Sequence, residues 1–357
     1  MTTIESYNLS DASRVRGHTR TISLRKKVAF ACVAVVLSLF VLLITGEVTA
    51  RLMRGRLFST QHVMSATLLS VEGAGCPTRY DSLTGWVNSP GSSKYDDRFG
   101  VTYNIDGQGF RSNGQPRPNG PAILCVGDSF TFGDEVADAD TFSASLEREL
   151  SLPVYNAGVV NFGFDQIVLE AERRVEQLQP DILVVAIISA DVLRCQYSSF
   201  QGCKPWFSVK DGILKHEYNP VPSIGQSGFV SKVFGYSHLI VYLSEFTPSL
   251  RRRVYGEHRT KVEHDDERVA FNVGRLLVHR LSHLRSKTSI LVVALPRRGE
   301  RVGARLVLDE SDRCSLESVD LLDSVALYGI ESHPTAGQHG FIASELLKAS
   351  VFQSLID

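Results

Sequence analysis

The stretch that decides the fold is AILCVGDSFTFG, residues 122–133. Its first five residues, 122–126, form a short apolar run that ends at Gly127, which is typical of a strand buried on both faces. Ser129 follows in the turn at the carboxyl end of that strand, where open parallel sheets bind their ligands. The helix expected after this turn can direct its N-terminus at the same place. The sequence therefore predicts an exposed serine at a ligand-binding edge.

Downstream of this stretch, short apolar runs alternate with amphipathic segments of helical length. The runs predict strands at residues 154–157, 181–188 and 289–295. The amphipathic segments predict helices at residues 141–150, 164–179, 265–285 and 338–355. Strands that alternate with helices form a parallel sheet with helices on both faces. We therefore expect residues 120–357 to form one doubly wound α/β domain.

Two segments fall outside this alternation. In the first, residues 192–260, FSVKDGILKHEY predicts a hairpin around Asp211-Gly212, and a helix is expected near residues 236–246. We interpret 192–260 as an insertion in the domain. The second segment, residues 47–119, is interpreted as a helical stalk followed by a preamble, rich in Gly, Pro, Asp and Ser, that wraps the domain.

An uncharged apolar run, VAFACVAVVLSLFVLLIT, occupies residues 28–45. As a helix it would be about 27 Å long, just enough to cross the hydrocarbon core of a membrane. More basic residues precede the run than follow it: Arg14, Arg16, Arg20, Arg25, Lys26 and Lys27 before it, and Arg51, Arg54 and Arg56 after it. This excess predicts a cytoplasmic N-terminus.

Residues 28–46 are therefore interpreted as a single-pass anchor in the inner, or cell, membrane. A polar, disordered tail at residues 1–27 would lie in the cytoplasm, and the α/β domain would lie in the periplasm or outside the cell. The alternative is a signal peptide cleaved after Val48-Thr49-Ala50. The apolar run exceeds the usual length of about 7–15 residues for such a peptide, and its basic lead is long, so the anchor is favoured.

Composition restricts the partners and cofactors. The chain has 357 residues, of which 38 are basic and 39 acidic, and this balance does not indicate a nucleic-acid partner. No set of Cys and His has the spacing of a zinc site, so neither a metal nor a cofactor is expected. Cys195 and Cys203 flank a short polar loop and could form a disulfide, as could Cys76 and Cys314. The sequence leaves this connectivity open.

Ser129 and His333 are the candidate catalytic pair. His333 lies in ESHPTAGQHG, just before the last expected helix. The loops after the first and last strands of a doubly wound domain can lie side by side, so His333 could act as general base toward Ser129. On the alternative interpretation, Ser129 and Asp128 are only a turn residue and a helix cap. His339 is expected to pack or cap locally.

Four motifs together resemble the blocks of the SGNH (GDSL) hydrolases: GDSFTFG, the NAG turn after the second strand, SADV at the end of the third, and HPTAGQHGFIA before the terminal helix. DSLTGW, YNIDGQGFRSN and KPWFSVKDGIL resemble membrane-linked bacterial members. The resemblance covers about residues 80–350. It implies a flavodoxin-like five-stranded sheet, with Ser129 as nucleophile and His333 as base.

The chain departs from the family at the oxyanion hole. The resemblance implies that this hole has three hydrogen-bond donors. The N–H of Ser129 is retained. Asn161 stands where the family has a glycine, with Gly163 two residues later, and Ala190 stands where the family has an asparagine. Asn161 tolerates a left-handed backbone, so its N–H can still serve, and its side-chain amide could replace the missing donor. The neighbouring Asp191, like Asp128, is expected to pin a loop.

The chain also departs from the family at the acid that orients the histidine. The family places it three residues before the histidine, which is Ile330 here, and Glu331 is one residue away from that position. Either Glu331 orients His333, or the site works as a Ser–His dyad with a carbonyl as orienter.

These expectations leave three functions. The leading one is an extracytoplasmic serine esterase or acyl hydrolase that acts on small-molecule or glycan acyl esters, including acylated cell-surface glycans. O-acyl transfer to exported polysaccharide would use the same residues, because it differs only in whether water or a sugar hydroxyl reaches the acyl-enzyme. Ala190 and Ile330 favour the third, a non-catalytic binding protein on the same fold.

Overall fold

The computed structural model describes residues 23–53, 76–200, 203–217, 219–221, 236–246, 260–262, 266–297, 299–327 and 332–356. The chain divides into two compact units, Met1–Phe58 and Ser59–Asp357, and each is described by itself.

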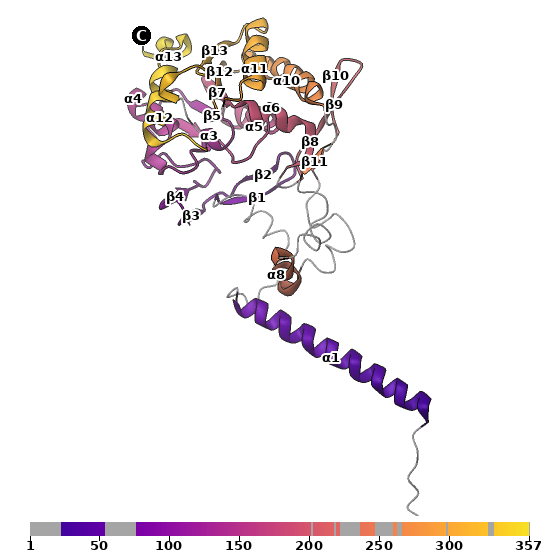
Figure 1. The fold of residues 1–357 in the computed structure, drawn as a ribbon. Helices are drawn as coiled ribbons and strands as arrows, with labels where there is room; N and C mark the ends of the chain where they lie inside the picture. Colours follow the sequence, from indigo (N-terminus) through magenta and orange to yellow (C-terminus); the bar gives the residue numbers. More distant parts are fainter. Residues whose placement is uncertain are drawn as a thin grey trace, which may run out of the picture. The chain divides into compact units, whose positions relative to one another are not determined.

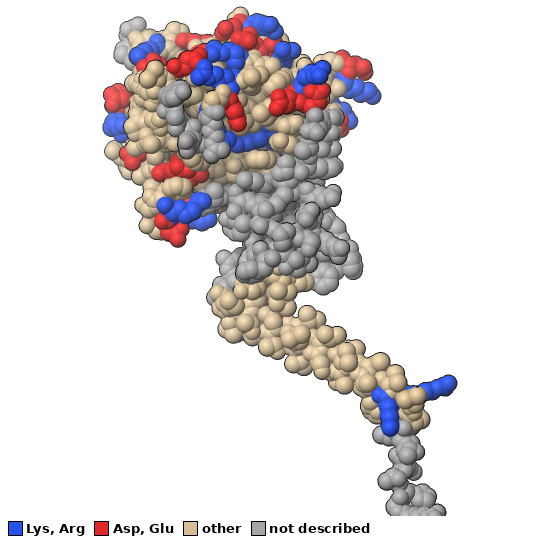
Figure 2. Space-filling model, in the orientation of Figure 1, with Lys and Arg blue, Asp and Glu red and all other residues tan. Residues whose placement is uncertain are grey.

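Among its described residues, the first unit is a single helix, α1 (Leu24–Met53; Figure 1). Most of its apolar side chains are exposed; Phe30 and Leu42, for example, are each 67% exposed. Figure 2 shows an uncharged surface along α1, with basic side chains at one end. By length and composition α1 can cross a membrane, a property that it shares with signal sequences. It extends beyond the predicted span of residues 28–46, and residues 54–75 of the expected stalk lie outside the described residues.

A five-stranded parallel sheet forms the centre of the second unit (Figure 1). Its strands are β5 (Ile123–Val126), β6 (Val154–Asn156), β7 (Ile182–Ile187), β12 (Ser289–Ala294) and β13 (Glu317–Asp320). They lie in the order β13-β12-β7-β5-β6, which is 2-1-3-4-5 along the chain. This is the flavodoxin-like arrangement, so the predicted fold class is confirmed. The order reverses at β5, and the carboxyl end of such a strand is where this fold binds ligands.

Each face of the sheet has its own apolar core. Leu124 and Val126 of β5 belong to one core, which α5, α10 and α11 cover. Ile123 and Cys125 belong to the other, which α4, α12 and α13 cover. The helices are α4 (Phe142–Leu150), α5 (Phe164–Leu178), α10 (Glu267–Ser282), α11 (Val302–Arg313), α12 (Ala336–Leu346) and α13 (Ser350–Ile356). Full burial of a Val, Leu or Ile side chain contributes about 1.5–3 kcal/mol, so these layers rest mainly on apolar packing.

The C-terminal part differs from the sequence prediction in two ways. The expected closing helix at residues 338–355 is two helices, because the Glu317 carboxylate accepts from Ser350 N and from Ser350 Oγ at 2.7 Å and so starts α13 afresh. The strand β13 was not predicted because it reads ESVD, without an apolar run. It lies at the edge of the sheet, where burial is incomplete.

The preamble consists of two antiparallel hairpins. They are formed by β1 (Thr78–Asp81) with β2 (Gly85–Asn88), and by β3 (Ser93–Asp96) with β4 (Val101–Asn104). Trp86 is buried, and its Nε1 donates to Val160 O at 2.9 Å. Asn88 Nδ2 donates to Gly158 O at 3.0 Å. The preamble therefore packs on the loop that follows β6.

The insertion contains the predicted hairpin, formed by β9 (Phe207–Lys210) and β10 (Ile213–His216). Asp211 and Gly212 have φ values of 52° and 75°, the left-handed backbone that a two-residue hairpin turn requires. Its other described elements include a short 3-10 helix (Arg194–Gln196), β8 (Tyr197–Phe200), β11 (Thr260–Val262) and helix α8 (His238–Phe246).

The cysteines are free thiols, so the disulfides that the spacing suggested are not formed. Cys195 follows a short helix and lies in the core, with its Sγ 3.7 Å from Asp191 O of the preceding turn. Cys76 is buried beside Asp134, and Cys314 lies beside a histidine.

Candidate active site

Ser129 is the first residue of the short helix α3 (Ser129–Phe132), directly after β5. It is only 7% exposed, so the expectation of an exposed serine was wrong. Asp128 caps this helix, because its carboxylate accepts from Phe130 N at 2.9 Å. A Cβ on Gly127 would lie 2.0 Å from Thr131 Oγ1 and 2.6 Å from Ala186 O, so only glycine lets the chain turn here. As the first residue of a helix, Ser129 has an N–H without an intrahelical acceptor.

His333 lies beside Ser129, although 204 residues separate them in the chain. Its Nε2 is 2.9 Å from Ser129 Oγ, a hydrogen-bond distance that suits a base and its nucleophile. The histidine stands just before α12, whose start is fixed by a capping box between Thr335 and Gln338. The structure thus brings together the two side chains that the sequence analysis paired.

Glu135 completes a chain of three hydrogen-bonded side chains. Its Oε1 lies 2.7 Å from His333 Nδ1, and it also accepts from Ser332 Oγ at 2.7 Å. The contact fixes which nitrogen of the imidazole faces the serine. Glu331 and Ile330 lie outside the described residues. The acid was expected next to the histidine in the sequence, whereas Glu135 lies six residues after Ser129, just beyond α3.

The backbone of Glu135 is left-handed, with φ 74°. Its N–H donates to Tyr103 Oη and to Asp134 Oδ1, both at 3.1 Å. The Glu135 side chain is 23% exposed and that of His333 18%, so the pair is partly shielded from water. In the sequence, Glu135 is distinguished only by being an acidic residue in the turn that follows the serine.

On the oxyanion side, the structure separates the two donors expected after β6. Asn161 is half-buried with φ 64°, the left-handed backbone that its residue type tolerates. Gly163 is the N-cap of α5, and its N–H donates to Gln166 Oε1 at 2.9 Å. That N–H is therefore already bonded to a side chain, so Gly163 is not carried forward among the proposed oxyanion donors.

Ala190 lies in the short helix α6 (Ser189–Leu193), next to a buried charge cluster. Asp191 accepts from Ile188 N at 2.9 Å and from Arg194 Nη1 at 2.7 Å. The same nitrogen donates to Phe162 O at 2.6 Å and lies 3.4 Å from Asp128 Oδ2. Burial, and then the Asp128 carboxylate, raise the pKa of Asp191 well above its ordinary value. These contacts are of the loop-pinning kind expected for both aspartates.

His339 lies in α12, one turn from the site, and is fully buried. Its Nδ1 accepts from Phe142 N at 3.2 Å, which joins the starts of α12 and α4. Burial, and then the positive charge of Arg111, lower the pKa of His339 to about 3. His339 is therefore neutral near pH 7 and packs locally, as expected.

Among the described residues, one cluster away from this site has side chains of the metal-binding kind: His279, Glu310 and Cys314. His279 Nε2 lies 2.9 Å from Glu310 Oε1, and His279 Nδ1 lies 3.4 Å from Cys314 Sγ. Glu310 is also paired with Arg313. Because the imidazole uses both nitrogens on its neighbours, the cluster is held together by its own hydrogen bonds.

No protein-family model and no curated protein matches the chain. Three solved structures are similar in fold. The first is a protein described as lipolytic and of the G-D-S-L family from Desulfitobacterium hafniense, with 10% identity and a TM-score of 0.34 over 64% of this chain and 99% of that one. The others are LAE5, an alpha/beta hydrolase from a Lake Arreo metagenome (14% identity, TM-score 0.39, 67% of this chain and 97% of that one), and the acetylxylan esterase Axe2 from Geobacillus stearothermophilus (14% identity, TM-score 0.34, 66% of this chain and 95% of that one). Matches this distant do not establish an activity, so the function is inferred from the side chains of the site.

Proposed function

We propose that this chain is a serine esterase or acyl hydrolase in which Ser129 is the nucleophile, His333 the general base and Glu135 the residue that orients His333. The hydrogen-bond chain from Ser129 Oγ through the imidazole to Glu135 Oε1, with contacts of 2.9 and 2.7 Å, carries the proposal. A serine hydroxyl is a weak nucleophile until an adjacent base accepts its proton, and that base needs the correct tautomer.

In the first half of the reaction, Ser129 Oγ attacks the ester carbonyl carbon while its proton passes to His333 Nε2. The carbonyl π electrons move to the oxygen, which becomes an oxyanion. When the intermediate collapses, the C–O bond of the ester breaks, and the leaving alcohol takes the proton from Nε2. The Glu135 carboxylate, hydrogen-bonded to Nδ1, stabilises the transient imidazolium.

In the second half, water attacks the acyl-enzyme and gives a proton to His333 Nε2. Collapse of the second intermediate releases the carboxylic acid and returns the proton to Ser129 Oγ. A sugar hydroxyl in place of water would complete O-acyl transfer by the same steps. Hydrolysis is the reaction that needs no further acceptor site, and it is the one proposed.

The N–H groups of Ser129 and Asn161 are the proposed oxyanion donors. A third donor, the asparagine of the resembling family, is replaced by Ala190. Loss of one such donor costs about 100- to 1,000-fold in rate. We therefore expect a slow enzyme unless the Asn161 amide fills the position.

The location and substrate proposed follow from α1. With α1 as a membrane anchor and the basic residues at its start in the cytoplasm, the site lies outside the cytoplasmic membrane. Acyl esters on cell-surface or exported glycans are the substrates that an anchored enzyme would meet there. The esterase Axe2, similar in fold, acts on acetylated xylan by its name, and such a substrate is a proposal for this chain.

Turnover of a short-chain aryl ester by the full chain in detergent tests the function. We expect release of the alcohol by the wild type and loss to the background rate in Ser129→Ala and His333→Ala. Gly340→Ala is the control for handling, because a Cβ at that position of α12 meets nothing within 4 Å. Equal rates in wild type and Ser129→Ala would refute the proposal and leave a binding protein on this fold.

A further inference from the structure

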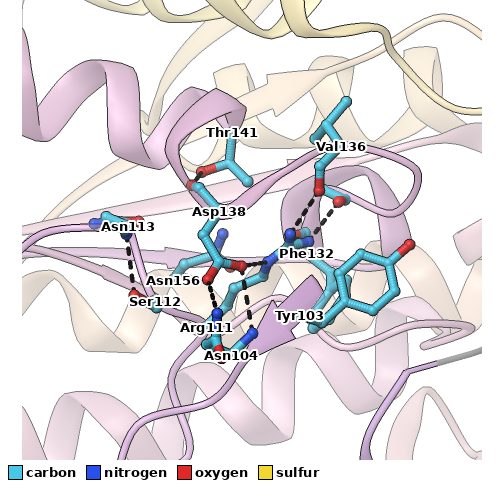
Figure 3. A network of polar contacts seen from close by, with 12 residues as sticks. Tyr103, Asn104, Arg111, Ser112, Asn113, Phe132, Val136, Asp138, Thr141 and Asn156 are labelled. Carbon is cyan, nitrogen blue, oxygen red and sulfur yellow. Dashed lines mark hydrogen bonds and ion pairs between the residues drawn. The ribbon is translucent and has the colours of Figure 1, made fainter. Parts of the chain in front are cut away.

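Arg111, in the preamble, has a buried guanidinium that is bonded to the loop carrying Glu135 (Figure 3). We call residues 132–138 the acid loop. Arg111 Nη1 donates to Phe132 O at 2.8 Å and to Gly133 O, Nη2 donates to Val136 O at 2.7 Å, and Nε donates to Asp138 Oδ1 at 3.1 Å. The accepting residues lie on both sides of Glu135. All three guanidinium nitrogens are thus used on one short loop.

Two aromatic rings enclose the guanidinium. Arg111 Cζ lies 4.6 Å from the ring centroid of Tyr103 and 4.5 Å from that of Phe132. Burial lowers the pKa of Arg111, and its contact with Asp138 acts against this effect. A buried cation is stable only when its hydrogen bonds are satisfied, and the acid loop supplies the acceptors. The guanidinium and the loop therefore hold one another in one arrangement.

Tyr103 binds the acid loop from the same side. Its hydroxyl donates to Asp134 Oδ1 at 2.8 Å and accepts from Glu135 N at 3.1 Å. Asn104 Nδ2 donates to Asp138 Oδ2 at 2.7 Å. Burial, and then the Asp134 carboxylate, raise the pKa of Tyr103, so its hydroxyl keeps its proton.

These contacts hold the backbone and the side chain of Glu135 in place. Its left-handed backbone is strained for a residue other than glycine and persists only when its surroundings impose it. A carboxylate that orients a histidine must also be held closely, because a misplacement of about 1 Å can cost about 100-fold in rate. The Glu135 side chain is directed at His333. The loop that carries it is held by contacts on residues 132, 133, 134, 136 and 138 and on the N–H of residue 135.

We propose that Arg111 and Tyr103 are positioning residues of the catalytic centre: they act through Glu135, so the preamble belongs to the active site. This inference rests on the proposed function. It assigns to two preamble residues an effect on the imidazole that is exerted through Glu135. A clamp that only stabilised the fold would change stability and leave the contact between His333 and Glu135 intact.

The first measurement is the proton magnetic resonance of His333 Nδ1–H, recorded on the full chain in detergent. A hydrogen bond from this group to a carboxylate moves the signal far downfield, whether or not the enzyme turns over. We expect the signal in the wild type, its loss in Glu135→Gln, and its loss or weakening in Tyr103→Phe and Arg111→Lys. Tyr103→Phe removes one hydroxyl from an otherwise unchanged ring, so it keeps the test valid if Arg111→Lys fails to fold.

Two matched controls come from the same preamble. Tyr80→Phe also removes a hydroxyl that makes a hydrogen bond, to Val221 O. Arg117→Lys changes an arginine that bonds Asp106 and Val154 O and stacks on Tyr155, away from the acid loop. Both are expected to keep the downfield signal and the wild-type kcat. Loss of the signal in these controls as well would mean that any damage to the preamble disturbs the site, and would overturn the specific roles of Arg111 and Tyr103.

The second measurement is a double-mutant cycle on ester hydrolysis. Tyr103→Phe should lower kcat about 10- to 100-fold with little change in KM, and it should add almost nothing in the Glu135→Gln background. Independent, multiplying losses, or an unchanged signal and kcat in Tyr103→Phe, would overturn the inference while leaving the esterase standing. A downfield signal that responds as expected, with no turnover dependent on Ser129, would refute the proposed function alone.

Discussion

At the scale of single residues, Glu135 is where the site differs most from its sequence expectation. The carboxylate that contacts the imidazole is that of Glu135, six residues after the proposed nucleophile Ser129. Glu135 lies in the acid loop, which continues from helix α3, and α3 begins at Ser129; one short stretch of chain thus carries both side chains that contact His333. Ile330, at the family's position for the acid, is compatible with this arrangement because the acid is supplied from elsewhere.

Glu135→Gln should lower kcat by about 100- to 10,000-fold with KM nearly unchanged, because glutamine can no longer fix the tautomer or stabilise the imidazolium. Glu331→Gln, the control, should change the rate by less than about tenfold, since Nδ1 already has a partner. Steady-state kinetics on an aryl ester decide the matter. If Glu135→Gln kept the wild-type kcat and Glu331→Gln lost most of its activity, Glu331 and not Glu135 would be the residue that orients His333.

At the scale of elements, the active-site loops are held by close backbone approach and by helix starts. Gly158, after β6, lies so near α3 that a Cβ would meet Phe132 N at 2.2 Å and Thr131 C at 2.6 Å. His339 joins α12 to α4 through its bond from Phe142 N. Both residues lie outside the reacting groups, so changes in them test how the framework supports the site.

Gly158→Ala should destabilise the protein by about 1–3 kcal/mol or more, because the new methyl group overlaps backbone that cannot rotate away. Gly340→Ala, in the open part of α12, should be neutral or should stabilise by about 0.5–1 kcal/mol. Urea unfolding measures both. A Gly158→Ala protein as stable as the wild type would contradict the close approach of the loop and α3.

His339 should make the fold sensitive to acid. Its pKa is lowered to about 3 in the folded state, so between the usual histidine value and about 3 only the unfolded state binds this proton. The stability contribution is present above the unfolded pKa and is lost at about 1.4 kcal/mol per pH unit as pH falls. His339→Gln should remove that slope from the urea midpoints measured between pH 6 and 4. An identical slope in both proteins would contradict the buried, neutral histidine.

At the scale of the whole molecule, most of the fold could be predicted because its pattern is local. Three segments have a local pattern that predicts their own backbone structure: the apolar run before Ser129, the amphipathic segment of α5 and the Asp211-Gly212 turn. The strand β13 and residue Glu135 could not be predicted for a different reason. β13 is a partly exposed edge strand, and the role of Glu135 depends on Tyr103, Arg111 and His333, which only the folded chain brings together.

The placement of the α/β unit outside the cytoplasmic membrane is a prediction about the whole chain. A reporter active only in the periplasm, fused after Asp357, should give signal, and a reporter active only in the cytoplasm should stay silent. The six basic residues before the apolar run are the cause, so their replacement by glutamine should weaken this bias. The opposite pattern of signals in the unaltered chain would refute the proposed orientation.

The most direct test of Ser129 as the nucleophile is to treat the full chain with a fluorophosphonate, which reacts with activated serines. The adduct is then located by peptide mass mapping. We expect one modified residue, Ser129, no labelling of Ser129→Ala, and slower labelling of His333→Ala and Glu135→Gln. Labelling at another serine, or undiminished labelling of Ser129→Ala, would contradict it.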